Sequence, residues 1–273
     1  MPVTREVLWG FFIKVWYDSQ MKFVTISDVH IKVPGDRASQ KFIQFLKTSD
    51  VQEADYIFLL GDIFDLLVGN GYQVETRYSD IFKELRSLLE QGKRIVQYEG
   101  NHDFHFEGLV KSLLAKWKIE SDHWKYEVEP KVHTFNGRKV LFCHGDEIEI
   151  GNLSYKFYRL WIRSFFIKFL ANYVVPAKWV QAIGDRASRK SRERNNHRYD
   201  HEAMNEKVRP LFRESAKLAG LKYQADMVIC GHSHCKDDYT GEVHYLNNGY
   251  FPNTESYISF DGEKALIKSL PTD

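Results

Sequence analysis

Five apolar runs of strand length recur along the chain, and a polar segment directly follows each of them. The runs are residues 23–26, 56–60, 95–98, 140–143 and 227–230. Their length and their β-branched and aromatic residues are typical of buried strands. Between them, apolar residues repeat at helical spacing, namely Phe42, Phe45 and Leu46 in one segment and Ile81, Leu85, Leu88 and Leu89 in another. Strands alternating with helices predict an α/β sheet flanked by helices, with ligands beyond the carboxyl ends of the strands.

Two stretches depart from this alternation. From residue 151 to about residue 225 the chain is helical, aromatic and basic, and we interpret this stretch as an inserted helical cap. Near the C-terminus, turn residues separate three strand-like runs, at 243–246, 257–260 and 265–267. We expect these three strands to form a second, mostly antiparallel sheet that closes a sandwich.

The composition is that of an ordinary globular protein that can bury a sizeable core. The chain has 273 residues, of which 43% are hydrophobic and 27% are charged. Its cysteines, Cys143, Cys230 and Cys235, form no CxxC pair, so we infer a reducing compartment and no disulfide framework. The net charge of +1 hides an asymmetry, because residues 151–199 carry 11 lysines and arginines against 2 acidic residues. The basic charge is therefore concentrated in the cap.

Residues 1–20 form an N-terminal extension, and we place the folded domain at residues 21–273. The apolar stretch of the extension, residues 7–17, contains Lys14 and is shorter than the roughly 20 apolar residues that span a bilayer. It also lacks the small-residue cleavage site of a secretory signal. Two interpretations stay open: translation begins at Met21, or the extension rests on a membrane or a partner.

The five polar segments all offer carboxylate, amide or imidazole groups. They are residues 28–30, 61–65, 100–103, 144–146 and 231–234. Such donors suit Mn²⁺ and related divalent ions, and no thiolate is needed. The segments supply about seven donors, enough for two ions that share a carboxylate. We therefore predict two divalent metal ions, most simply Mn²⁺, with Fe, Zn²⁺ and Mg²⁺ as alternatives because their ligand preferences overlap.

The spacing of the donors suggests how they converge. Asp28 and His30 lie two residues apart at a strand end, so both side chains can aim at one ion. Asp62 follows the next strand and can bridge to the second ion. The other expected ligands are Asn101, His144, His232 and His234. The last two again lie two residues apart, so their imidazoles can be divided between the ions.

In order and content, these segments resemble those of the calcineurin-like metallophosphoesterases, over most of residues 22–260. The resemblance implies an α/β fold, a four-layer α/β/β/α sandwich with an inserted helical cap, and a metal-dependent phosphoesterase or pyrophosphatase. It implies one ion held by Asp28, His30, Asp62 and His234, and another held by Asp62, Asn101, His144 and His232. In that family the ions make hydroxide available near neutral pH for in-line attack on phosphorus, and they offset the phosphoryl charge.

Residues beside the ligands are assigned supporting roles. His102 and Asp103 are the candidate catalytic residues: His102 acts as an acid or steadies the phosphoryl oxygens, and Asp103 is expected to orient it. For Asp65 and Asp146, a hydrogen bond to a ligand and a purely structural role both stay open.

The cap supplies candidate substrate-binding residues. Aromatic residues crowd 155–170, with Arg159 and Arg163 on one side. A second basic cluster, suited to phosphates, includes Arg186, Ser188, Arg189 and Lys190. The alternative is that the aromatic residues pack the cap onto the body while the charges are solvated.

Within the superfamily, this cap is similar to that of the enzymes that hydrolyse UDP-2,3-diacylglucosamine in lipid A biosynthesis. The matching stretches are residues 158–161, 174–176 and 186–190. This resemblance implies that the six basic and polar cap residues contact the nucleotide and its phosphates. It also implies a cytoplasmic enzyme, peripheral on the inner face of the bacterial cytoplasmic membrane, which releases UMP and a lipid monophosphate and needs no nucleic acid.

One residue departs from that enzyme family, because His102 stands where its members usually carry arginine. Pyrophosphate cleavage expels a phosphate, which needs little protonation, whereas an ester that expels an alkoxide benefits from an acid such as histidine. His102 therefore keeps open a phosphomonoesterase or phosphodiesterase that acts on a nucleotide, a nucleic acid or another amphipathic ester. Binding of a polyanion by the basic cap would then weaken with salt. A scaffold without catalysis is disfavoured, because every segment keeps its ligands.

Overall fold

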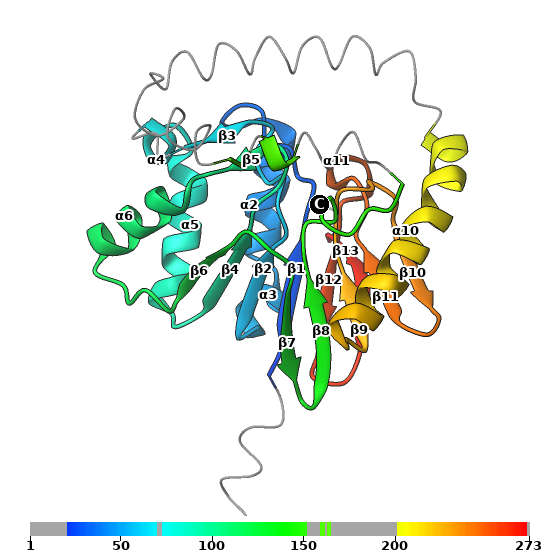
Figure 1. Ribbon diagram of the computed structural model, residues 1–273. Coiled ribbons are helices and arrows are strands. Elements are labelled where there is room, and N and C mark those ends of the chain that lie inside the picture. Colours follow the sequence, from blue (N-terminus) through cyan, green and yellow to red (C-terminus); the bar gives the residue numbers. More distant parts are fainter. Residues whose placement is uncertain (1–20, 70–72, 152–158, 162, 165–200, 272–273) are drawn as a thin grey trace, which may run out of the picture.

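Two β-sheets face each other at the centre of the computed structural model, and helices cover their outer faces (Figure 1). The structure describes residues 21–69, 73–151, 159–161, 163–164 and 201–271. The extension 1–20 and most of the predicted cap, including Arg186, Ser188, Arg189 and Lys190, lie outside these residues. Among the residues that are described, no helix is both long and apolar enough to cross a membrane.

The first sheet has six strands in the order β13-β12-β1-β2-β4-β6. Their bounds are β1 Phe23–Ile26, β2 Tyr56–Leu59, β4 Arg94–Tyr98, β6 Trp124–Glu127, β12 Ser256–Phe260 and β13 Ala265–Ser269. Strands β1, β2, β4 and β6 run parallel, whereas β12 pairs antiparallel with β1. The carboxyl ends of β1, β2 and β4 therefore meet at one edge, where three of the polar segments begin.

The second sheet has five strands in the order β10-β11-β9-β8-β7. Their bounds are β7 Lys131–Phe135, β8 Arg138–Phe142, β9 Met227–Ile229, β10 Asp237–Thr240 and β11 His244–Asn247. Strands β8, β9 and β11 are parallel, with an antiparallel strand on each side. Two short strands, β3 Leu67–Val68 and β5 Asp103–Phe104, pair separately.

The helices form two outer layers. Their bounds are α2 Arg37–Leu46, α3 Ser49–Glu53, α4 Gln73–Arg77, α5 Ser79–Glu90, α6 Glu107–Trp117, α10 His201–Tyr223 and α11 Phe251–Thr254. The predicted apolar faces of α2 and α5 are buried in one core cluster with α6 and the first sheet. On the other side, Phe212, Ala216 and Ala219 of α10 pack against the second sheet.

A third core cluster fills the space between the sheets. Its aromatic rings come from both sheets, and the centroids of Phe58 and Phe142 stack 3.9 Å apart. Phe23 of the central strand contacts both of these rings edge-on. With helices outside each sheet, these clusters confirm the expected four-layer α/β/β/α architecture.

The three C-terminal strands were expected to form the second sheet by themselves, and this prediction is wrong, because they do not form a sheet of their own. β12 and β13 extend the first sheet beside β1, whereas β11 lies in the second sheet parallel to β9. Phe260 of β12 lies opposite Phe23 and is stacked on it, with ring centroids 4.8 Å apart. Burial of this side chain between the sheets fixes the register of β12.

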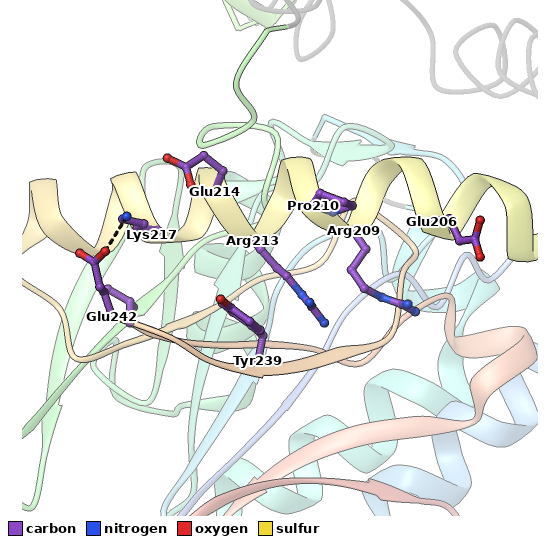
Figure 2. A pocket seen from close by; sticks show the side chains of 9 residues that line it. Glu206, Arg209, Pro210, Arg213, Glu214, Lys217, Tyr239 and Glu242 are labelled. Carbon is purple, nitrogen blue, oxygen red and sulfur yellow. Dashed lines mark ion pairs between the residues drawn. The ribbon is translucent and has the colours of Figure 1, made fainter.

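Helix α10 begins inside the range expected for the cap, yet it forms the outer layer over the second sheet. A groove of about 540 Å³ lies between α10 and β10 with the turn that follows it, as Figure 2 shows. The charges in this groove compensate one another, because Lys217 pairs with Glu242 and Arg213 pairs with Asp237. None of the predicted metal ligands lines the groove.

Candidate metal centre

The polar segments converge at the carboxyl ends of the strands that precede them. Tight packing of three loops at Gly61, Gly100 and His144 brings candidate ligands together. A Cβ atom on Gly61 would lie 2.7 Å from the backbone of Gly100 and 2.8 Å from Nδ1 of His144. Gly61 also has a φ of +80°, which side chains disfavour. Only glycine therefore lets the loops after β2, β4 and β8 approach this closely.

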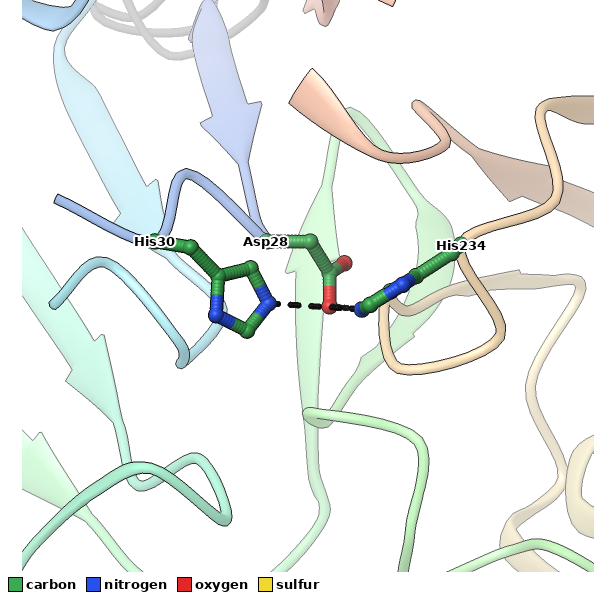
Figure 3. Close-up of side chains that lie close together, drawn as sticks. All are labelled: Asp28, His30 and His234. Carbon is green, nitrogen blue, oxygen red and sulfur yellow. Dashed lines mark hydrogen bonds and ion pairs between the residues drawn. The ribbon is translucent and has the colours of Figure 1, made fainter. Parts of the chain in front are cut away.

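The first group of candidate ligands is Asp28, His30 and His234, which point toward one another in Figure 3. Nε2 of His234 lies 3.4 Å from Oδ1 of Asp28 and 3.3 Å from Nε2 of His30. Asp28 is fully buried, and His30 is 5% exposed. Two imidazole nitrogens and a carboxylate oxygen at this spacing suit one divalent ion.

The second group is Asn101, His144 and His232. Oδ1 of Asn101 lies 2.9 Å from Nε2 of His144 and 3.0 Å from Nδ1 of His232. Nδ1 of His144 donates to the carbonyl oxygen of Leu60 at 2.8 Å, which leaves the Nε2 lone pair facing the pocket. An amide oxygen and two imidazoles thus meet at a second point.

Asp62 lies between the two groups. Its Oδ2 atom is 3.7 Å from Nε2 of His30 and 3.6 Å from Nε2 of His144. Its Oδ1 atom accepts a hydrogen bond from the backbone N–H of His102 at 2.8 Å. This bond fixes the carboxylate so that Oδ2 faces ligands of both groups. The structure thus brings all seven predicted ligands together.

The backbone at these positions is strained. Five of the seven candidate ligands have a positive φ, between 52° and 65°; they are Asp28, His30, Asp62, His232 and His234. Residues other than glycine rarely adopt this conformation, and it costs roughly 1–3 kcal/mol each. Such strain is typical of functional sites, where surrounding contacts hold side chains in a required direction.

The electrostatics of the pocket favour positive charge. Burial raises the pKa of the Asp28 and Asp62 carboxyl groups, but nearby histidines outweigh it and lower both pKa values. Burial lowers the pKa of His232, but the hydrogen bond to Glu149 and the charges of Asp146 and other aspartates raise it to about 9. A buried pocket with this excess of carboxylates is suited to cations, and its oxygen and nitrogen donors fit divalent metal ions.

Hydrogen bonds from two turn residues, Asn247 and Asn248, were not anticipated from the sequence pattern, yet they hold the residues that precede the candidate ligands Asp28 and His232. Asn248 donates from Nδ2 to the carbonyl oxygen of Ser27 at 3.2 Å, and Asn247 donates to the carbonyl oxygen of Gly231 at 2.9 Å. The Ser27 hydroxyl donates to Oδ2 of Asp28 at 2.5 Å. Both asparagines are fully buried, although residues 247–249 had the composition of an ordinary turn.

His102 and Asp103 have different surroundings from those expected. Asp103 was expected to orient His102, but its carboxylate instead accepts backbone hydrogen bonds from Asp62, Ile63, Phe64 and Gly100. The His102 ring donates from Nδ1 to the carbonyl oxygen of Asp65 at 2.9 Å. Asp103 therefore holds the Asp62 loop, because a buried carboxylate satisfies its charge with the loop amides.

The side chain of His102 lies beside the first ligand group. Its ring meets the His30 ring edge-on, with centroids 4.9 Å apart. Burial lowers the pKa of His102, but the carboxylates of Asp62, Asp65 and Asp28 outweigh it and raise the pKa above its usual value. His102 is thus placed to carry a proton next to the candidate metal centre. Asp65 contacts the other side of His30, with Oδ1 3.6 Å from Nδ1.

Of the predicted substrate-binding residues, Arg159 and Arg163 lie within the described part of the chain. Both guanidinium groups lie beside buried carboxylates: Nε of Arg159 is 3.1 Å from Oδ2 of Asp146, and Nε of Arg163 is 3.5 Å from Oε2 of Glu99. The sequence left two possible roles for Asp146. In the structure its carboxylate pairs with Arg159 of the cap. Burial raises the pKa of Asp146, but the charges of His144 and Arg163 outweigh it and lower this pKa to about 2.

Comparison with known proteins agrees with this geometry. The family model described as calcineurin-like phosphoesterase matches residues 21–236. A UDP-2,3-diacylglucosamine hydrolase of Histophilus somni (strain 129Pt) is 23% identical over 223 residues, which cover 81% of this chain and 87% of that protein. A hydrolase of the same name from Serratia proteamaculans (strain 568) is 24% identical over 216 residues, covering 78% and 82%.

Among solved structures, a novel archaeal phosphodiesterase shares 13% identity, with a TM-score of 0.44 over 91% of this chain and 100% of that chain. The family match, by contrast, contains all five polar segments and hence all seven candidate ligands. It confirms the resemblance that the segments suggested and the assignment to metal-dependent hydrolases. The chain therefore belongs to the calcineurin-like phosphoesterase family.

Proposed function

We propose that this phosphoesterase holds two divalent metal ions, most simply Mn²⁺, that share Asp62. One ion would be held by Asp28, His30, Asp62 and His234, and the other by Asp62, Asn101, His144 and His232. The observation that carries this proposal is the position of Asp62 Oδ2, 3.7 Å from His30 and 3.6 Å from His144. When bound, such ions activate water and offset charge on the phosphoryl oxygens.

The residues of the chain would supply orientation and a proton. The bond from the His102 amide to Oδ1 of Asp62 keeps the shared carboxylate directed at both groups. The His102 side chain, fixed by the Asp65 carbonyl oxygen, would donate a proton to the leaving oxygen or steady the phosphoryl oxygens. Asp103 would act on the reaction only through the loop that it holds.

For the substrate, we propose a lipid-linked nucleoside diphosphate of the UDP-2,3-diacylglucosamine type, cleaved at its pyrophosphate to UMP and a lipid monophosphate. The names of the curated relatives support this proposal. So do two exposed apolar side chains next to Arg159 in the cap, Leu160 at 69% and Trp161 at 63% exposure. We propose that these side chains meet acyl chains at the inner face of a cytoplasmic membrane.

His102 favours a second candidate, a phosphodiesterase or phosphomonoesterase on a nucleotide, a nucleic acid or another amphipathic ester. Its raised pKa and its place beside His30 suit protonation of a poor leaving group, which a pyrophosphate does not require.

The test compares two substrates with the purified protein and Mn²⁺. UDP-2,3-diacylglucosamine in detergent micelles reports the lipid activity through release of UMP, and bis-p-nitrophenyl phosphate reports simple diester hydrolysis. Release of UMP supports the first candidate. Turnover of the diester alone removes it and favours the second.

A further inference from the structure

Three buried carboxylates lie directly beside the candidate metal ligands and make no part of the two ligand groups. Glu99 precedes the segment with Asn101, and Asp146 and Glu147 follow His144. Each of the three side chains is 3% exposed or less. Buried carboxylates need a charged or hydrogen-bonding partner, because an isolated buried charge is costly.

The partners are two arginines of the described part of the cap, Arg159 and Arg163. Arg163 lies 3.5 Å from Glu99, and its Nη1 also donates to the carbonyl oxygen of Val128 at 3.0 Å. It approaches Asp146 and Glu147 at 3.9 Å and 3.8 Å. One side chain thus reaches the ends of three strands, β4, β6 and β8.

Arg159 repeats this contact one helical turn earlier. Nε lies 3.1 Å from Asp146, and Nη2 lies 3.5 Å from Oε1 of Glu147. A further approach, at 3.7 Å, is to the exposed Glu129. The arginine side chains are only 17% and 11% exposed.

The Glu99 carboxylate, which faces Arg163, is itself held by hydrogen bonds. Oε1 of Glu99 accepts hydrogen bonds from the Tyr126 hydroxyl at 2.6 Å and from the His105 backbone N–H at 2.8 Å. Its Oε2 atom is the one that faces Arg163. The acceptor is therefore held in place by the body, and it can set the position of the cap.

From these contacts we propose that Arg159 and Arg163 are positioning residues. They fasten the described part of the cap around them, residues 159–161 and 163–164, to the loops that carry Asn101 and His144, and they do not bind substrate phosphate. Glu99, Asp146 and Glu147 lie within 3.9 Å of their guanidinium groups, whereas Leu160 and Trp161 between them are exposed. The pairing thus sets where the exposed side chains of Leu160 and Trp161 lie relative to the loops that carry Asn101 and His144, and it would determine the class of substrate that is admitted, namely amphipathic phosphate esters. This last step rests on the proposed function.

Hydrogen exchange on the substrate-free protein tests the fastening without any activity. In Arg163→Met, amides of the peptide covering residues 159–164 should exchange roughly tenfold faster than in the wild type, because local opening is no longer opposed. Peptides from β1 should be unchanged, which shows that the body stays folded. Arg163→Lys should recover part of the protection. Arg86→Met, which breaks an exposed pair with Glu90 on α5, is the matched control and should change nothing.

Kinetics separate positioning from direct binding. Arg159→Met, whose side chain is the more exposed of the two, should raise the KM for UDP-2,3-diacylglucosamine about tenfold, with kcat and the hydrolysis of bis-p-nitrophenyl phosphate within about threefold of wild type. Unchanged exchange in both methionine variants, together with the higher KM, would assign the arginines to substrate phosphate and overturn the proposal. Failure to hydrolyse either substrate would refute the proposed function alone, because the exchange experiment still decides the role of the arginines.

Discussion

Asn248 holds the backbone of Ser27 from the opposite end of the chain, 221 residues away. The N–H of Ser27 donates to Oδ1 of Asn248 at 3.1 Å, and Nδ2 of Asn248 donates back to the Ser27 carbonyl oxygen at 3.2 Å. The next residue, Asp28, has a φ of 54°. This reciprocal pair therefore helps to hold a candidate ligand in a strained conformation, and it couples the segment after β11 to the metal centre.

Replacement of Asn248 by alanine should weaken metal binding. Without the amide, the backbone of Ser27 loses both partners, and Asp28 is freer to leave the left-handed region. Partners of metal ligands typically contribute 10–100-fold to affinity, so we expect a loss of about that size in Mn²⁺ titrations followed by calorimetry. The control is Asn136→Ala, whose amide bonds Gly262 in an exposed turn. Equal affinity in both variants would contradict this role of Asn248.

The role of His102 can be determined from how its replacement changes the hydrolysis rates of substrates with different leaving groups. If its imidazole donates a proton, His102→Ala should slow hydrolysis of an alkyl phosphodiester by about 10²–10⁴-fold, and that of an activated p-nitrophenyl ester much less. A uniform loss across both substrates would instead assign stabilisation of phosphoryl charge. The comparison is kcat/KM for a series of esters with graded leaving groups, with His123→Ala, in a surface loop, as the control.

His133 should make stability depend on pH. Burial and the charge of Lys131 lower the pKa of its imidazole to about 4 from 6.5 in the unfolded chain. Between these values the unfolded chain binds a proton that the folded protein does not, so unfolding free energy should fall as pH falls from about 6.5 to 4.

In His133→Phe this contribution should vanish, and the pH dependence should become shallower than in the wild type. The measurement is urea denaturation of metal-free protein at several pH values, with His123→Gln as the control. A parallel pH dependence in wild type and His133→Phe would count against the assigned pKa. Above pH 7 the two should differ by a constant amount.

Much of the fold follows from local pattern. The five predicted strands correspond to β1, β2, β4, β8 and β9, because buried parallel strands have continuous apolar runs. Two of the three C-terminal strands, β12 and β13, were assigned to the wrong sheet, since an apolar run predicts that a strand is buried and not which neighbour it pairs with. Phe260 joins the first sheet through its stacking on Phe23, a contact between residues far apart in sequence.

The candidate metal ligands could be predicted from the sequence better than the residues that hold them in place. Donors such as Asp62 and His144 follow strands in an order that limits the possible sites. Asn248 could not be distinguished from a turn residue, because its function depends on burial against Ser27. Arg163 resembled a phosphate-binding residue for a similar reason: charge spacing does not reveal that a buried carboxylate, Glu99, lies opposite.

The most direct test of the proposed two-ion centre is to count the bound metal ions and to measure the magnetic coupling between them. Metal-free protein reconstituted with Mn²⁺ should bind two ions per chain and give the electron paramagnetic resonance signal of an exchange-coupled pair. Asp62→Ala should lose the coupled signal and all hydrolysis, whereas Asp80→Ala, on the exposed face of α5, should keep both. A single ion in the wild type, or a coupled and active pair in Asp62→Ala, would contradict a centre built around Asp62.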